Sequence, residues 1–168
     1  MDVSLADRTR FEIRPIRPDD KASLARGLTL LSPETVRRRF LTAKPSFSSA
    51  ELRYLTEVDG HDHVALVAVP RDRPGHIAGV GRFVRLPDRP DTAEFAIVVA
   101  DRFQRRGLGT RLARQLTEEA RRHGIRRFTA TTLSDNVAVE RLVETISEGL
   151  IRVPAGSGVR DLVLELAA

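Results

Sequence analysis

The sequence contains no cysteine and no tryptophan, and it has one methionine and one tyrosine. Without cysteine the chain cannot form disulfides, thiolate metal sites or a cysteine nucleophile, which excludes redox chemistry through protein thiols. Aromatic residues make up 5% of the chain, few for a protein that stacks on nucleic-acid bases. These absences turn attention to charged groups and backbone.

Long hydrophobic runs are also missing, because no uninterrupted apolar stretch approaches the roughly 18 residues that a membrane-spanning helix needs. The opening MDVSLADRTR has neither a basic start followed by an apolar stretch nor a small-residue cleavage site. We therefore expect a cytoplasmic protein with no membrane partner. Its 168 residues, 41% hydrophobic and 30% charged, predict one globular domain spanning residues 1–168.

Lysine is scarce although the chain is basic. Lysine and arginine together number 28 against 23 acidic residues, a formal net charge of +5, yet only Lys21 and Lys44 are lysines. Arginine suits bidentate contacts with phosphate or carboxylate, which is compatible with DNA, RNA or a phosphorylated cofactor. An arginine surplus also arises from codon composition alone, so the positions of the arginines must decide.

The first third of the chain predicts a strand followed by helices. Alternating apolar residues in FEIRPIRPDD indicate a strand that ends near Pro18, and a helix is expected over residues 21–31. Ser32 followed by Pro33 predicts a second helix start. A capping box of Ser48 and Glu51 predicts a third.

The remaining sequence is richer in strands. Runs at residues 63–69, 76–86 and 92–100 predict consecutive antiparallel strands. A helix over 107–124, a strand over 125–133, a helix over 135–146 capped by Asp135, and a closing hairpin around 154–158 follow. The predicted fold class is α+β, with a mixed, mostly antiparallel central sheet flanked by helices.

The segment AEFAIVVADRFQRRGLGTRL joins an apolar strand to a glycine-containing helix start, which is a place where anions bind. Gly107 and Gly109 would let the backbone approach a ligand closely. Arg102, Arg105 and Arg106 crowd a helix N-terminus, where each positive charge costs about 0.3 to 1 kcal/mol. A multiply charged anion would reverse this cost, whereas the alternative is a solvated basic turn whose glycines serve only the chain reversal.

The spacing in this segment reads QxxGxG directly after the strand. The motif consists of Gln104, Arg105, Arg106, Gly107, Leu108 and Gly109. It resembles the acetyl-CoA-binding motif of the GNAT superfamily of N-acetyltransferases. The segments RPIRPDD, LSPETVRRRF and HVALVA are most similar to the bacterial protein-lysine acetyltransferase (Pat-like) branch. The resemblance implies a single domain with the GNAT acyl-CoA N-acyltransferase fold and acetyl-CoA as cosubstrate, without a metal.

The resemblance also implies roles for individual residues. In this family the fourth strand splays from its neighbour and its backbone holds the pantetheine arm, a role that falls to Ile97, Val98 and Val99. The loop from Gln104 to Thr110 would hold the pyrophosphate. Asn136 would contact the cofactor from the following helix, although an ordinary helix-start residue is the alternative there.

Glu94 is the candidate general base, because it is the only acidic residue in the apolar strand and stands where many family members carry a glutamate. A lysine-like amine with a pKa near 10.4 is mostly protonated at neutral pH, so a base removes a cost of roughly 4 to 5 kcal/mol. Alternation places Glu94 on the same face as Val98. The alternative is a structural ion pair with Arg82 or Arg85.

One departure from the family concerns the general acid. Many members place a tyrosine seven residues beyond the asparagine, but Val143 stands here and the sole tyrosine is Tyr54. The prediction is an N-acetyltransferase that acts by direct attack of a primary amine, either a small molecule or a protein lysine. The missing tyrosine keeps a non-catalytic acyl-CoA-binding regulatory module as the alternative, and the oligomeric state, a homodimer included, stays open.

Two other patterns carry less chemistry. The segment DGHDHV holds two histidines and two aspartates, and we interpret it as a turn before a strand rather than a metal site. Gly79 and Gly81 form a second GxG inside a strand pattern, which predicts a bulge. No nucleic-acid partner is expected, because the arginines cluster at a turn suited to a small phosphate ligand.

Overall fold

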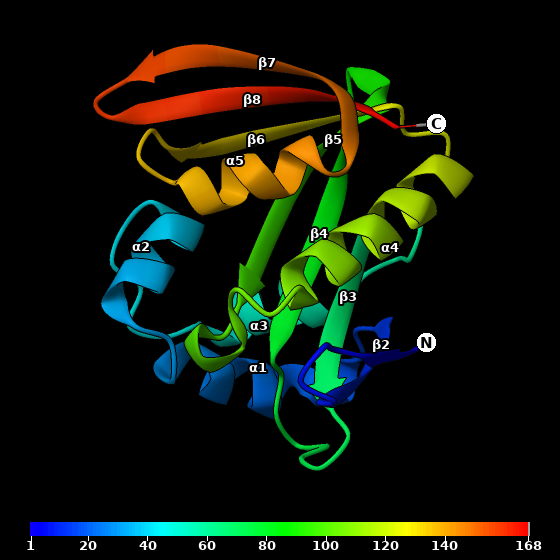
Figure 1. Ribbon diagram of the computed structural model, residues 1–168, viewed down its shortest axis with the longest axis vertical. Coiled ribbons are helices and arrows are strands. Elements are labelled where there is room, and N and C mark those ends of the chain that lie inside the picture. The colour runs from blue at the N-terminus through cyan, green and yellow to red at the C-terminus, as the bar shows by residue number, and fades with distance from the viewer. Residues whose placement is uncertain (168) are drawn as a thin grey trace.

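The computed structural model describes residues 1–167 and contains one twisted, eight-stranded sheet in the order β1-β2-β3-β4-β5-β6-β8-β7 (Figure 1). The strands are β1 (Asp2–Ser4), β2 (Arg10–Pro15), β3 (His63–Pro70), β4 (Gly79–Leu86), β5 (Arg89–Val99), β6 (Arg127–Leu133), β7 (Ser147–Gly156) and β8 (Val159–Leu166). The helices are α1 (Lys21–Thr29), α2 (Pro33–Phe40), α3 (Ser49–Thr56), α4 (Leu108–Arg122) and α5 (Val137–Glu144), with short 3₁₀ turns η1 (Pro18–Asp20) and η2 (Asp101–Phe103).

The sheet is mostly antiparallel, as the sequence predicts. Strands β3, β4 and β5 are consecutive antiparallel neighbours, and only β5 and β6 pair in parallel within the described residues. The α+β class is therefore confirmed. The closing hairpin also forms, but its turn is confined to Ser157 and Gly158 because β7 extends through Gly156.

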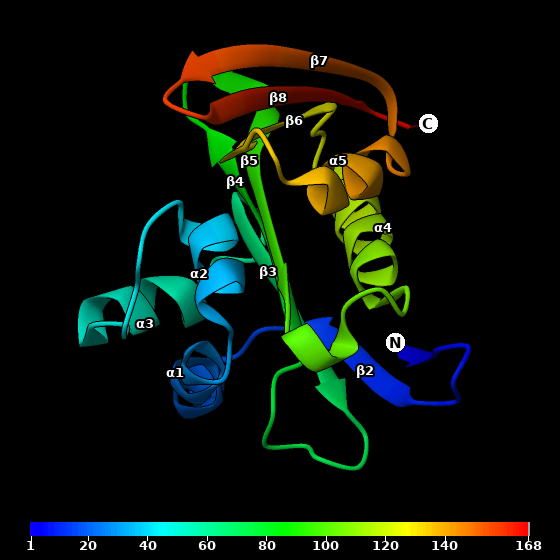
Figure 2. The same ribbon diagram turned by 60° about the vertical axis from the view of Figure 1, so that its left-hand side comes forward.

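Helices cover both faces of the sheet. Figure 2 shows α1, α2 and α3 on one side of β3, β4 and β5, and α4 and α5 on the other. The α4 face holds the larger apolar core, where Leu108, Leu112 and Leu116 are fully buried. Beneath them Phe95 stacks on Phe128 with ring centroids 5.1 Å apart. Burial of this face contributes about 25 cal/mol per Å² of apolar surface and fixes α4 against the sheet.

The bulge predicted at Gly79 and Gly81 is wrong. Strand β4 pairs regularly there, and its register shift falls between Arg85 and Leu86. A Cβ on Gly81 would lie 3.3 Å from the Leu112 side chain, and one on Gly79 would lie 3.2 Å from a backbone oxygen of β5. The two glycines therefore allow α4 to pack closely on the sheet.

Two of the three predicted helix caps are confirmed. Ser32 Oγ accepts from the Thr35 N–H at 3.2 Å, and Ser48 with Glu51 forms the capping box. The cap predicted at Asp135 is wrong, because Asn136 Oδ1 accepts from a backbone N–H of the first turn of α5. The backbone of Asp135 is used in the preceding tight turn, where its carbonyl accepts from the next residue but one.

None of the helices formed by residues 1–167 combines the length and apolar character needed to cross a membrane.

Candidate active site

A cleft opens where β5 and β6 separate. Their parallel ladder contains only three pairs, from Thr92 opposite Arg127 to Glu94 opposite Thr129. Beyond Glu94, β5 stays paired with β4 alone in the described part of the chain. Figure 1 shows β6, β7 and β8 turned away from β3, β4 and β5 at this point. The resulting cleft has a volume of about 720 Å³ and is bordered by β5, β6, α2, α5 and the start of α4.

Helix α5 borders the place where the two strands separate. Val139 and Leu142 of α5 pack against the same apolar core as Ile97 and Val99 of β5. A Cβ on Gly109 of α4 would be in ordinary contact with Val99 and Leu142, at 3.5 and 3.6 Å. The helix that follows β6 thus borders the cleft where the ladder ends. The β5 edge keeps its backbone polar groups available to another partner.

The N-terminus of α4 faces this cleft without a side-chain cap from any residue in 1–167. Its N-cap is Gly107, which has a φ of 87°, in the left-handed region that favours glycine. Nothing lies within 4 Å of the position where a Cβ on Gly107 would stand. Unpaired N–H groups and the positive end of the helix dipole attract anions. The geometry therefore fits a diphosphate.

The three arginines of this turn go to different places. Arg105 lines the cleft, with a φ of 56° in the left-handed region. Arg106 pairs with Asp7 at 2.9 Å, and Arg102 lies over the Phe103 ring at 4.5 Å. Only one of the three thus has its place in the cleft wall, so the crowding expected from the sequence is relieved by the protein itself.

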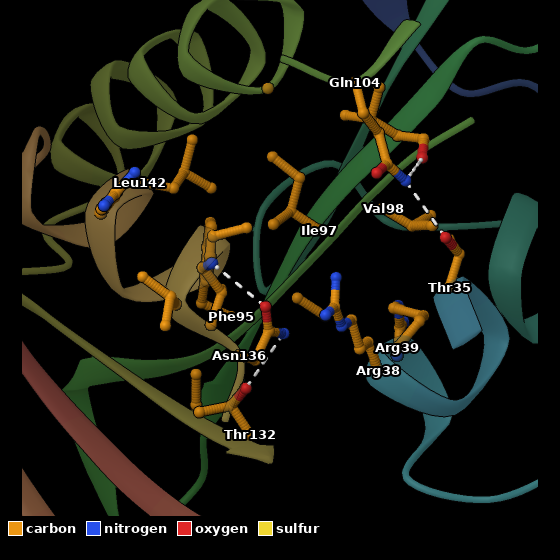
Figure 3. Close-up of a pocket in the computed structure, with 18 of the residues that line it drawn as sticks. Thr35, Arg38, Arg39, Phe95, Ile97, Val98, Gln104, Thr132, Asn136 and Leu142 are labelled. Carbon is orange, nitrogen blue, oxygen red and sulfur yellow. Dashed lines mark hydrogen bonds between the residues drawn. The ribbon is translucent and has the colours of Figure 1, made fainter. Parts of the chain in front are cut away.

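The other predicted loop residues divide in the same way. Gln104, Gly109 and Thr110 line the cleft. The Leu108 side chain is fully buried in the core, so only its backbone N–H is placed at the helix start. Ile97, Val98 and Val99 also line the cleft, from the unpaired edge of β5 (Figure 3).

A hydrogen-bond network ties the loop to α2. Gln104 Nε2 donates to the Val99 carbonyl at 2.9 Å and to Thr35 Oγ1 at 3.1 Å (Figure 3). Thr35 in turn donates to Asp101 at 2.8 Å, and Ser32 donates its hydroxyl and its N–H to the same carboxylate. Burial opposes ionisation of Asp101, but these hydrogen bonds lower its pKa below the ordinary value. No local sequence pattern predicts this network, because the residues that it joins across to α2 are 66 to 69 positions apart.

Asn136 both caps α5 and lines the cleft. Its side chain is buried, with Nδ2 donating to Thr132 Oγ1 at 3.3 Å and Oδ1 accepting from the Val139 N–H at 3.3 Å. The helix-start role is thus present. Because the same residue borders the cleft, its contact with a cofactor stays a prediction.

Glu94 stands at the last rung of the β5–β6 ladder, where the cleft begins. Its side chain is exposed and shares the Val98 face of β5, which α2 covers. A carboxylate at this position is accessible to an amine that enters between α2 and β5.

The ion-pair alternative for Glu94 named Arg82 and Arg85, and both have other partners. Arg82 is buried and donates to His63 Nε2 at 2.9 Å. Arg85 donates to Asp62 at 2.7 Å. Neither guanidinium therefore serves as the structural partner of Glu94.

The cation that acts on Glu94 is Arg39, in the last turn of α2. Burial lowers the pKa of Arg39, and the Glu94 carboxylate opposes that shift. The Arg39 guanidinium lies 4.8 Å from the centroid of the Phe40 ring. Arg39 was not among the residues singled out in the sequence, because nothing local in RRRF distinguishes one arginine from its neighbours.

The position of the missing tyrosine is part of the core. Val143 is fully buried, and the sole tyrosine, Tyr54, is 58% exposed on α3 with its ring 4.9 Å from His63. Tyr54 is not among the residues that border the cleft. The hydroxyl groups there belong to threonines, Thr35 and Thr110 among them, so a side-chain general acid of the usual kind has no place in the cleft wall.

The turn expected at DGHDHV is confirmed. Asp59 Oδ1 accepts from the backbone N–H groups of His61, Asp62 and His63 at 2.8 to 2.9 Å. His63 then enters β3 and contacts Arg82. These residues build the start of a strand.

The β5–β6 cleft beside the uncapped, glycine-led start of α4 fits the acyl-CoA site that the QxxGxG resemblance implies, and comparison with known proteins supports the acyltransferase class. The model of the acetyltransferase (GNAT) family matches residues 33–145. The chain belongs to this family, as the QxxGxG motif predicts.

Relatives of known name carry the same assignment. The chain is 34% identical over 146 residues to acetyltransferase Pat of Mycolicibacterium smegmatis, covering 87% of this chain and 43% of that protein. It is 32% identical over 140 residues to acetyltransferase PA5475 of Pseudomonas aeruginosa, covering 83% of this chain and 75% of that one. The chain thus spans less than half the length of the mycobacterial relative.

Solved structures show the same fold. The GNAT domain of S. lividans PAT superposes with a TM-score of 0.87 at 29% identity, covering 99% of this chain and 96% of that one. The yncA acetyltransferase of Salmonella typhimurium, solved with its cofactor acetyl-CoA, has a TM-score of 0.68 at 21% identity and covers 94% of each chain. At that identity the second match shows the fold alone.

Proposed function

We propose that this chain transfers an acetyl group from acetyl-CoA to a primary amine by direct attack, with Glu94 as general base. The observation that carries the proposal is the end of the β5–β6 ladder at Glu94. Because the strands part there, the carboxylate, the free edge of β5 and the N-terminus of α4 all border one cleft.

The cofactor would lie along this cleft. Backbone groups of Ile97, Val98 and Val99 would hold the pantetheine arm as a further strand would be held. N–H groups of the loop from Gln104 to Thr110 would hold the diphosphate, with Arg105 adding a charge-assisted contact. Asn136 would approach from α5. The presence of acetyl-CoA in the Salmonella structure of the same fold supports acetyl-CoA as the cofactor.

The reaction then requires one function of the protein's own side chains, which is to accept a proton. When bound, the thioester supplies an activated acetyl carbonyl. Glu94 accepts a proton from the incoming ammonium, either directly or through a water, so that the neutral nitrogen can form a bond to the carbonyl carbon. The C–S bond breaks in the same transfer. The nitrogen releases its second proton to solvent and the departing thiolate takes one from solvent, since no tyrosine is among the described residues that border the cleft.

The acceptor has two candidate classes at this stage. The resemblance to the bacterial protein-lysine acetyltransferase (Pat-like) branch, together with the similarity to acetyltransferase Pat, makes a protein lysine side chain one of them, and a small-molecule amine is the other. Both require the same base and the same acyl donor.

The test is release of coenzyme A thiol with acetyl-CoA and a mixture of primary amines. Glu94→Gln removes the base while keeping the shape, and we expect kcat to fall by about 10²- to 10⁴-fold. Binding of acetyl-CoA should be unchanged, because the diphosphate contacts lie elsewhere. If both proteins bind acetyl-CoA and neither releases thiol, the chain is a non-catalytic acyl-CoA-binding module instead.

A further inference from the structure

We infer that Arg39 is an anion-binding residue of the acceptor site, and that the acceptor is a small primary amine that carries a carboxylate close to its amino group. This inference rests on the proposed function, because it names the substrate class of the same cleft.

The position of Arg39 places a cation beside the base. Arg39 lies in the last turn of α2 and lines the cleft together with Glu94 and Thr35. Figure 3 shows Arg38 and Arg39 together on the α2 side of the cleft, across from Leu142 on α5.

The charges around Arg39 do not balance. Arg38 is neutralised by Glu34 at 2.5 Å, whereas the ion pairs formed within residues 1–167 give Arg39 no carboxylate partner of its own. Arg82 lies close behind, and burial together with Arg39 lowers the pKa of Arg82 to about 10. The guanidinium groups of Arg39 and Arg82 therefore repel each other, and the Glu94 carboxylate acts on Arg39.

The neighbour of Arg82 does not restore the balance. Burial and the Arg82 charge lower the pKa of His63 to about 4, so His63 is neutral at pH 7 and accepts a hydrogen bond without adding negative charge. A half-buried surplus cation at the wall of a cleft is stabilised by an anion that enters the cleft.

The arrangement matches a zwitterion. Glu94 attracts an ammonium group and Arg39, whose planar guanidinium suits bidentate contact, attracts a carboxylate. Because Glu94 and Arg39 line the same cleft and α2 packs against β5, the two charges of the acceptor must also be close together. A polyamine offers no carboxylate and would meet the surplus positive charge. Amino acids are the simplest class that fits.

The experiment compares matched acceptors. Thiol release is measured with a panel of amino acids, each paired with its amide, and with spermidine and a lysine-containing peptide. We expect at least one amino acid to exceed its amide by about tenfold or more in kcat/KM. The amino group of the amide is less basic than that of the acid, so a larger fraction of it is neutral and reactive at pH 7. Basicity alone therefore favours the amide, and a preference for the acid must come from another cause.

The matched variants are Arg39→Gln and Arg37→Gln. Arg37 is an exposed residue of the same helix and does not border the cleft. For Arg39→Gln we expect kcat/KM for the preferred amino acid to fall by about 10- to 100-fold, mainly through KM, since a charge-assisted contact is lost. The loss on the amide should be at least about threefold smaller, because any effect of Arg39 on Glu94 is common to both acceptors, and Arg37→Gln should keep the wild-type preference.

Several outcomes would overturn the inference. Preference for spermidine, the peptide or the amides would leave the proposed function standing and remove the carboxylate site. An equal loss on acids and amides in Arg39→Gln would give Arg39 a structural role only. The acyl group of the donor is another source of a carboxylate for Arg39. If Arg39→Gln loses activity only with succinyl-CoA as donor, Arg39 binds the acyl group and the inference is contradicted. No thiol release with any amine would contradict the proposed function itself.

Discussion

At the scale of single residues, the proposed diphosphate site depends on backbone groups that a side chain would cover. Gly107 combines a φ of 87° with open space at its Cβ position and leads the helix whose first N–H groups face the cleft. Gly124 at the other end of α4 has a φ of 77° and equally open space. Both glycines thus adopt a left-handed backbone conformation, but Gly107 borders the cleft and Gly124 does not.

We therefore predict that Gly107→Glu and Gly124→Glu lose similar stability, about 1 to 2 kcal/mol each from the left-handed backbone. Only Gly107→Glu should lose acetyl-CoA binding, because its carboxylate occupies and repels the diphosphate site. In a thermal shift assay at a hundredfold excess over Kd, wild type and Gly124→Glu should gain about 2.7 kcal/mol, or roughly 5 to 10 °C. An equal shift in Gly107→Glu would show that the diphosphate binds elsewhere.

Residue by residue, the sequence predicts the cleft better than it predicts how the arginines are used. Gln104, Gly107 and Gly109 follow from local spacing, since a strand end and a helix start are adjacent in the chain. Arg106 was expected at the anion, but it pairs with Asp7, which is 99 residues away. A local pattern contains no information about such a partner.

At the scale of elements, the Asp101 carboxylate connects the start of α2 to the turn that precedes α4. Asp101 accepts from Ser32 and Thr35 at the start of α2, and Thr35 accepts from Gln104. These hydrogen bonds therefore connect the helix that carries Arg39 to the turn that precedes α4.

Replacing Asp101 by Asn should loosen this connection, since an amide can accept at only one atom and loses the charge that strengthens the contacts. We expect KM for acetyl-CoA to rise by about 3- to 10-fold and Tm to fall by a few degrees, with kcat per bound complex less affected. Ser48→Ala, which removes a comparable cap on α3 away from the cleft, should lower Tm without changing KM. A Tm loss in Asp101→Asn with an unchanged KM would mean that the tether is structural only.

The element boundaries show where local reading succeeds. Caps at Ser32 and Ser48 are local hydrogen bonds and were predicted from their own neighbours. The role of Gly79 and Gly81 was misjudged, because the partner that demands small residues is α4, more than 30 positions further along the chain. The separation of β5 from β6 is likewise not indicated by any local pattern in the two strands. It was expected only through the family resemblance.

At the scale of the whole molecule, one buried histidine links folding to pH. His63 has a folded-state pKa of about 4, chiefly through burial and then through Arg82, against 6.5 for an unfolded histidine. The unfolded chain binds the extra proton first as pH falls, so stability is full above pH 6.5 and declines towards pH 4.

Between pH 7.5 and 5 this group should lower the free energy of unfolding by about 2 kcal/mol. His63→Gln keeps an acceptor for Arg82 without titrating and should remove most of that slope. His61→Gln, at an exposed neighbour, should keep it. Urea unfolding at both pH values measures the difference, and equal slopes in wild type and His63→Gln would contradict the assignment.

The central claim is that the diphosphate of acetyl-CoA lies on the N-terminus of α4 with the thioester reaching Glu94. A crystal structure of the complex tests it most directly. We predict phosphate oxygens within hydrogen-bond distance of the N–H groups of Leu108 and Gly109, the pantetheine along the β5 edge, and the acetyl carbon between Glu94 and α5. Cofactor density outside the β5–β6 cleft, or a thioester turned away from Glu94, would contradict the account.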